Sequence, residues 1–117
     1  FILSFCQQEP DNNGLNAVLS YMSQHVSDNL DIDHLCRLAC MSRTKFFHEF
    51  RVHLGCTPIA FQQQLRLKQA ASMIKNGQQI THACFESGFS NTSHFSRSFK
   101  LFHGVTPSQY KIRHLSN

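Results

Sequence analysis

Apolar residues recur every three or four positions along most of the chain, which is the spacing of a helix with one buried face. Between about residues 13 and 26, for example, Leu15, Val18 and Met22 follow one another at this interval. No segment shows the apolar–polar alternation that is typical of a half-exposed strand. The pattern therefore predicts an all-α fold.

Capping residues, glycines and prolines mark where these helices begin and end. Ser42 is a good N-cap, and Gly55 and Gly104 follow periodic segments, as glycine does at helix C-termini. Pro58 and Pro107 suit the first position of a helix. These signals predict about seven helices, which we place near 13–26, 31–39, 42–54, 58–75, 81–87, 91–103 and from 107 onward.

The second half of the chain repeats the first, including its caps and stops. At an offset of 49, the matching residues are Phe46, Phe50, Gly55, Thr57 and Pro58 with Phe95, Phe99, Gly104, Thr106 and Pro107. At an offset of 48, they are Ile32, His34, Cys36 and Ser42 with Ile80, His82, Cys84 and Ser90. The second repeat therefore carries one extra residue in its turn, and chance does not explain the agreement.

Each repeat contains a short helix, a turn and a second helix that is polar on its outer side. This is the helix-turn-helix pattern, whose second helix lies in the major groove of DNA. We expect two such subdomains joined by a long helix. The expected divisions are a linker stub or tail at 1–12, a first subdomain at 13–56, a linker helix at 57–76 and a second subdomain at 77–117.

Placing residues at 100° intervals separates an inner from an outer face on both second helices. The residues predicted to face inward are Phe46, Phe50 and His53 in the first repeat, and Phe95, Phe99 and Phe102 in the second. The residues predicted to contact DNA are Arg43, Thr44, Phe47, His48, Arg51, Thr92, Ser93, Ser96, Arg97 and Lys100. Arg97 suits a bidentate contact to guanine, serines suit base edges, and Arg51 and Lys100 suit phosphates.

Charge is distributed very unevenly along the chain. Residues 1–34 contain five acidic residues and no Lys or Arg, whereas residues 35–117 hold all eleven basic residues and two acidic ones, a net charge of +9. Such a segment favours a polyanionic partner, because neutralising phosphates releases counterions. A polar outer face alone is common to surface helices, but two corresponding faces in a basic segment favour double-stranded DNA.

The linker helix adds a constraint of length. A helix of about nineteen residues spans roughly 28 Å. This is close to the ~34 Å that separates successive major-groove faces. We therefore expect one chain to reach two adjacent groove segments without dimerising.

The chain resembles the DNA-binding domain of the AraC/XylS family of bacterial transcriptional regulators. The segments that carry the resemblance are LCRLACMSRTKFFHEFRVHLGCTP at 35–58, RLKQAASMI at 66–74 and GFSNTSHFSRSFKLFHGVTPSQY at 88–110. The resemblance implies seven helices and sequence-specific DNA binding in the bacterial cytoplasm, at the nucleoid. It also implies contact with RNA polymerase when the regulator is an activator.

Some positions depart from the family pattern. Ala83 replaces a larger aliphatic residue, and Ile80 and Phe85 are the residues expected to compensate for its lost volume. Phe47 and His48 replace a polar or basic pair. We therefore expect thymine-methyl contacts from the first recognition helix and more hydrogen-bonded reading from Arg97.

Other classes of function stay open at this point. An enzyme is not expected, and neither is a cofactor or metal: similar domains occur in repair methyltransfer proteins, but of the cysteines only Cys36, beside Arg37, has a neighbour that lowers a thiol pKa. A redox or metal sensor with only nonspecific DNA affinity would use His34, Cys36, Cys40, His82 and Cys84. A protein-interaction module that contacts polymerase is the third alternative. We expect free thiols, because no C-x-x-C pair is present.

The ends of the sequence suggest a longer protein. The chain begins at Phe1 without a methionine, and residues 1–12 have the composition of a linker. We expect an effector or dimerisation domain outside this sequence, most simply on the N-terminal side. No apolar run approaches the ~20 residues of a membrane helix, so no membrane association is expected.

Overall fold

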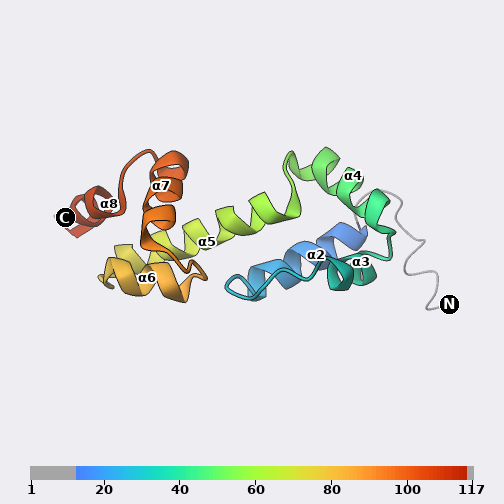
Figure 1. The fold of residues 1–117 in the computed structure, drawn as a ribbon, viewed down its shortest axis with the longest axis horizontal. Helices are drawn as coiled ribbons and strands as arrows, with labels where there is room; N and C mark the ends of the chain where they lie inside the picture. Colours follow the sequence, from blue (N-terminus) through green and yellow to red (C-terminus); the bar gives the residue numbers. More distant parts are fainter. Residues whose placement is uncertain (1–12, 116–117) are drawn as a thin grey trace. The chain divides into compact units, whose positions relative to one another are not determined.

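The computed structural model of the chain describes residues 13–115, which are all-α and contain no strand. The helices are α2 (Asn13–Gln24), α3 (Ile32–Ala39), α4 (Arg43–Leu54), α5 (Pro58–Lys75), α6 (Ile80–Glu86), α7 (Thr92–His103) and α8 (Pro107–Leu115) (Figure 1). The predicted fold class and helix order are confirmed over these residues. None of these helices is long and apolar enough to cross a bilayer.

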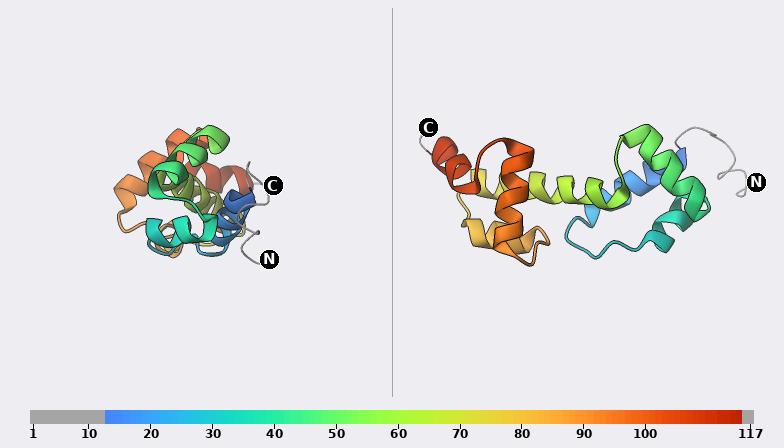
Figure 2. Two further views of the ribbon diagram at one scale, coloured as in Figure 1. Left: turned by 90° about the vertical axis from the view of Figure 1, so that its right-hand side faces the viewer. Right: turned by 45° about the horizontal axis from the view of Figure 1, so that its top comes forward.

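The described residues form two compact units, and the boundary between them falls within α5. The first unit comprises 13–25 and 29–62, and the second comprises 26–28 and 63–115. Each unit holds one helix-turn-helix pair, α3–α4 in the first and α6–α7 in the second (Figure 2). The subdomain limits predicted at residues 56 and 76 remain predictions.

The first unit is built around the inner faces of α2, α3 and α4. Its buried residues include Leu15, Val18 and Met22 from α2, Leu35, Cys36 and Ala39 from α3, and Phe46 and Phe50 from α4. The contact of α2 with α3 is close, because a Cβ added at Gly14 would stand 2.4 Å from the carbonyl oxygen of Ala39. Only glycine fits at this point of the interface.

The second helix of each pair is capped in the same way at both ends. The Ser42 hydroxyl accepts a hydrogen bond from the Lys45 amide (3.2 Å), and the Asn91 side chain accepts one from the His94 amide (3.0 Å). A glycine in the left-handed region ends α4 and α7, as predicted. The N-cap equivalent to Ser42 is thus Asn91, and the predicted pairing with Ser90 is wrong.

The turns between the paired helices differ in the residue that takes the left-handed conformation. Cys40 has φ 59°, and Gly88, its counterpart at an offset of 48, has φ 104°. A left-handed conformation costs a non-glycine residue roughly 1–2 kcal/mol. Cys40 and Gly88 are 48 residues apart, whereas the N-caps Ser42 and Asn91 are 49 apart. The extra residue of the second repeat therefore lies between Gly88 and Asn91.

The second unit packs α5, α6 and α7 around Phe95 and Phe99, which are fully buried. Ala83 is also fully buried, and Ile80 packs against this cluster as predicted. Phe85 does not compensate for Ala83, because its side chain is 52% exposed. Phe89, from the turn after α6, belongs to the same cluster: it is buried and packs edge-on against Phe95, with ring centroids 5.1 Å apart.

The guanidinium of Arg66 on α5 holds three backbone carbonyls of the second unit. It donates to Val26 (2.9 Å), Asp28 (3.0 Å) and Gly88 (3.2 Å). Burial lowers the pKa of Arg66 and the Asp28 carboxylate opposes this effect. A Cβ at Gly88 would lie 2.7 Å from Nε of Arg66. The turn before α7 is therefore fixed by a side chain of the linker helix.

Candidate nucleic-acid interface

The inner residues of α4 and α7 decide which side chains face solvent. Phe46 and Phe50 are fully buried four positions apart, and Phe95 and Phe99 repeat this arrangement. In α7 the half-buried His103, four residues after Phe99, continues this row, and its Nε2 donates to the carbonyl of Leu67 (3.1 Å). The outer face of each helix is thereby fixed in orientation.

Two residues predicted to face inward are exposed. Phe102 is 38% exposed because His103, not Phe102, continues the buried row of α7. His53 is also at the surface, where its Nε2 lies 3.2 Å from Oε1 of Glu49. The inner residues are spaced four apart. The prediction instead placed the residue three positions after Phe50 and Phe99 on the inner face.

The structure places the ten predicted DNA-contacting residues at the surface. Nine are exposed: Arg43, Thr44, Phe47, His48, Arg51, Thr92, Ser93, Arg97 and Lys100. Ser96 is half-buried. Phe47 is the large apolar side chain among them, and it is 37% exposed while its ring packs edge-on against Phe46 (5.7 Å). Their roles as DNA contacts remain predictions.

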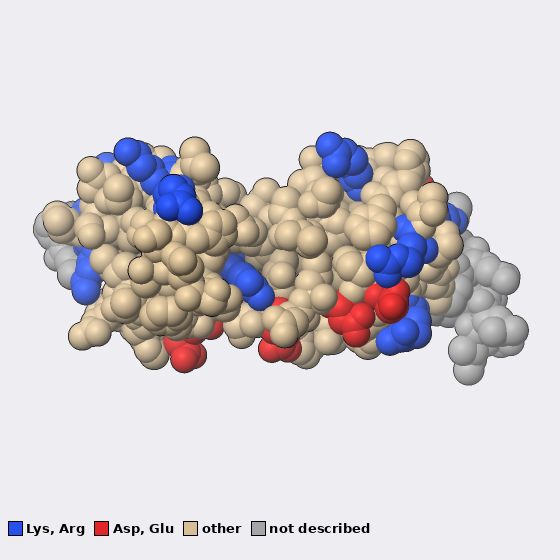
Figure 3. All heavy atoms as spheres, in the orientation of Figure 1, with Lys and Arg blue, Asp and Glu red and all other residues tan. Residues whose placement is uncertain are grey.

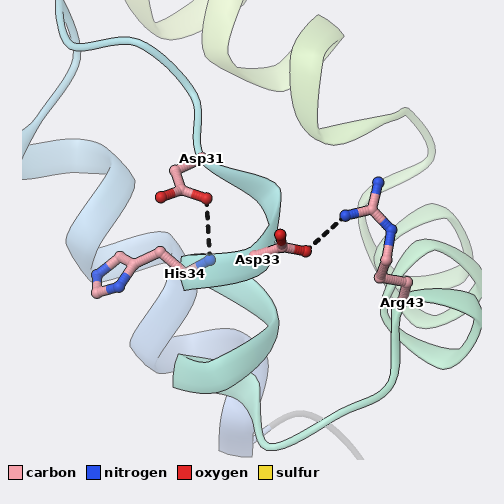
Figure 4. A network of polar contacts seen from close by, with 4 residues as sticks. All are labelled: Asp31, Asp33, His34 and Arg43. Atoms are coloured by element: carbon pink, nitrogen blue, oxygen red, sulfur yellow. Dashed lines mark hydrogen bonds and ion pairs between the residues drawn. The ribbon is translucent and has the colours of Figure 1, made fainter.

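Arg43, at the start of α4, already has a partner within the first unit. Its Nη1 donates to Oδ1 of Asp33 on α3 at 2.6 Å (Figure 4). Both side chains are more than half exposed. An exposed ion pair contributes less than about 1 kcal/mol to stability. Arg43 is therefore available to exchange this carboxylate for a phosphate.

Basic side chains outnumber acidic ones on the second helix of each pair: α4 carries three Lys or Arg residues and one acid, and α7 carries two and no acid. On the face drawn in Figure 3, Lys and Arg atoms of the first unit lie over α4, whereas α3 carries Arg37 together with the acidic Asp33. In the second unit, basic atoms lie over α7 and acidic atoms lie near α6. The second helix of each pair thus carries the positive potential that a phosphate backbone requires.

The sequence reasoning missed two exposed aliphatic residues on these outer faces. Leu101 on α7 is 88% exposed, and Val52 on α4 is 61% exposed. Leu101 lines an open hollow of about 450 Å³ together with Arg97, Lys100 and Gly104. The signal was present, because Leu101 follows Arg97 by four residues and so lies on the same face of the helix.

The two buried cysteines, Cys36 and Cys84, lie in different units. Burial raises the pKa of both Cys36 and Cys84, and for Cys36 it outweighs the opposing effect of Arg43 and Arg37. Residues 13–115 hold no cluster of three or more side chains that could bind a metal. Cys40 is disulfide-bonded, so the expectation of free thiols is wrong at this position.

Comparison with known proteins supports the same interpretation. The family model described as a helix-turn-helix domain matches residues 35–113. An uncharacterised helix-turn-helix transcriptional regulator from Haemophilus influenzae is 36% identical over 98 residues, which are 83% of this chain and 33% of that protein. The chain thus spans about a third of this relative's length.

Solved structures share the fold. A probable AraC family transcriptional regulator from Rhodopseudomonas palustris superposes with a TM-score of 0.80 at 28% identity, covering 87% of this chain and 97% of that one. The DNA-binding domain of the transcription factor AdpA, solved with a target DNA, has a TM-score of 0.78 at 22% identity, covering 88% and 94%. The chain belongs to the AraC family of helix-turn-helix transcriptional regulators and forms a DNA-binding domain of that family.

Proposed function

We propose that α4 and α7 enter two successive major-groove segments of one DNA duplex and read its sequence together. The observation that carries this proposal is the repeated outer face on two equally capped helices. In each helix the predicted contact residues stand at corresponding positions, as with His48 and Arg97 or Arg51 and Lys100. AdpA, which has this fold, was solved with its target DNA.

The length of α5 supports the use of adjacent groove segments. This helix is continuous over 18 residues. At 1.5 Å per residue it is roughly 27 Å long. One turn of DNA is ~34 Å. The match in scale favours a single chain acting on about one and a half to two helical turns, with DNA bending to absorb the difference.

The two recognition helices divide the reading between hydrogen bonds and apolar contacts. Arg97 makes a bidentate contact to guanine, and Ser93 hydrogen-bonds a neighbouring base edge. Phe47 contacts a thymine methyl group and His48 a base edge, while Arg51 and Lys100 meet phosphates. Since bidentate contacts discriminate between bases by about 1–3 kcal/mol, α7 supplies most of the specificity.

Selection from a randomised duplex pool, followed by binding at several salt concentrations, tests the proposal. Arg97→Ala should relax base preference at one position, with a loss of about 1–3 kcal/mol on the selected site. Lys100→Ala should weaken binding to all sequences and reduce the salt slope by about 1. Lys68→Ala, an exposed lysine on α5, is the matched control.

The assignment to α7 has a clear contrary outcome. If Arg97→Ala keeps its base preference while Phe47→Ala or His48→Ala abolishes it, α4 is the main reader. If the wild-type domain binds every sequence alike with a steep salt slope, its charge alone acts on DNA and sequence-specific reading by these helices is excluded.

We propose wider roles for the longer protein to which the chain corresponds. Because the chain spans about a third of its relative, an effector-binding or dimerisation domain accompanies it. The protein acts in the bacterial cytoplasm and activates transcription by contacting RNA polymerase, without catalysis of its own. Adding purified polymerase to the domain–DNA complex tests the contact, which predicts cooperative binding at a promoter that carries the selected site.

A further inference from the structure

Val52 and Leu101 occupy the same position in the two repeats. They are related by the offset of 49 that also relates the N-caps and the final glycines of α4 and α7. Both are highly exposed, at 61% and 88%. A single exposed aliphatic residue needs no explanation. Two at equivalent positions on both recognition helices indicate a shared use.

Each of these side chains ends the row of outer residues that faces DNA. Leu101 follows Ser93 and Arg97 at intervals of four, and Val52 follows Thr44 and His48 in the same way. Eight helical residues span about 12 Å. Base pairs are spaced 3.4 Å apart along the duplex. The row is therefore about as long as three to four base pairs, and Val52 and Leu101 extend it by one turn beyond His48 and Arg97.

Cations accompany both aliphatic residues. Lys100 precedes Leu101, and both line the hollow on α7 together with Arg97. Arg51 precedes Val52 on α4 and is exposed. Against an apolar protein surface these cations would lose their hydration without gaining a partner, which is costly. Against DNA, phosphates pair with the cations and leave the apolar group facing the groove.

We propose that Leu101 and Val52 each contact the C5-methyl group of a thymine, at the end of the base-contacting row of their helix. This methyl is the apolar group that the major groove displays, so it is the chemistry that an exposed aliphatic side chain recognises there. The proposal rests on the DNA reading proposed above. It adds a thymine at one defined place in each half of the target site.

Replacing thymine by deoxyuridine tests the contact, because this removes the methyl and keeps every hydrogen-bonding group. On the selected duplex, one such replacement in each half should weaken wild-type binding by about two- to fivefold, as expected for losing one buried methyl. Leu101→Ala should be insensitive to the replacement in one half and Val52→Ala to that in the other. Ile112→Ala and Ile59→Ala, similarly exposed on α8 and α5, should retain the wild-type response.

The outcomes separate this proposal from the one on which it rests. If a sequence is selected but the uridine scan is the same for wild type, Leu101→Ala and Val52→Ala, the methyl contact is refuted and sequence reading stands. The same holds if no thymine is selected at these places, since the face then serves a partner other than DNA bases. If no sequence is selected at all, both proposals fail. The substitutions are on exposed side chains, so the variants should fold.

Discussion

The two helix-turn-helix repeats share their inner residues but differ at several outer positions. Phe46 and Phe95 are fully buried at matching positions, and the N-caps and terminal glycines of α4 and α7 also correspond. On the outer faces, Phe47 faces solvent where the second repeat has the half-buried Ser96. The buried positions set the orientation of a recognition helix, so the outer ones can diverge without changing the fold.

The shorter helices and turns show a second kind of difference, in local stability. Asp31 caps α3 by accepting from the His34 amide, whereas its counterpart Gln79 makes no side-chain cap on α6. The first repeat has Ala39 where the second has Ser87, whose buried hydroxyl has no hydrogen-bond partner. At these two positions the polar groups of the second repeat have fewer hydrogen-bond partners than those of the first.

The largest expected effect tests whether the two cores are equivalent. Phe50→Ala and Phe99→Ala should each destabilise the unit that contains them by about 3–5 kcal/mol, because both remove a fully buried ring. Hydrogen exchange would report the loss separately for α4 and α7. Phe47→Ala, on a partly exposed ring, is the control, and a small effect of either core substitution would refute the comparison.

Ser87 offers a test in the opposite direction. Ser87→Ala should stabilise the second unit by about 1 kcal/mol, since a buried hydroxyl without a partner costs about 1–3 kcal/mol. Ala39→Ser should destabilise the first unit by a comparable amount. Urea unfolding of both variants measures this. A loss of stability in Ser87→Ala would mean that the hydroxyl is satisfied in solution.

The caps of α3 and α6 provide a smaller test. Gln79→Asp should stabilise the second unit by about 0.5–1 kcal/mol by supplying the missing cap, and Asp31→Gln should destabilise the first by a similar amount. Thermal unfolding detects shifts of this size. Gln78→Asp, at an exposed neighbouring residue that does not cap α6, controls for the added charge.

The smallest effect on stability concerns Asp33, which holds Arg43 in the first repeat only. Asp33→Asn should change stability by less than about 1 kcal/mol, because the ion pair is exposed. It should raise DNA affinity at low salt and steepen the salt slope by up to about 1, since Arg43 becomes free to meet a phosphate. Arg43→Ala should remove the difference. An unchanged slope in Asp33→Asn would mean that Arg43 does not reach DNA.

Much of the fold was predictable because several local signals agree. Ser42, Gly55, Pro58 and Gly104 mark helix ends by caps and turns that act within a few residues, and the repeat supplied each signal twice. The inner positions of His53 and Phe102 were predicted wrongly, since spacings of three and of four both fit a short helix. In α7, the packing of His103 on α5 decides between them.

The site was predictable as a surface but not in its contacts. An outer helix face follows from the inner residues, so all ten predicted side chains lie at the surface. The pairing of Arg43 with Asp33 depends on how α3 and α4 pack, which local patterns do not contain. Leu101 and Val52 were missed because the predicted outer rows ended at Arg51 and Lys100, one residue before them.

The three hydrogen bonds of Arg66 also bear on the order in which the chain folds during synthesis. Its partners lie 38 and 40 residues before it and 22 residues after it. Since the N-terminus leaves the ribosome first, the carbonyls of Val26 and Asp28 cannot form these hydrogen bonds until Arg66 has been synthesised. The third hydrogen bond forms only after Gly88 has also left the ribosome. The segment between α2 and α3 therefore acquires its final contacts late, when all of α6 has already been synthesised.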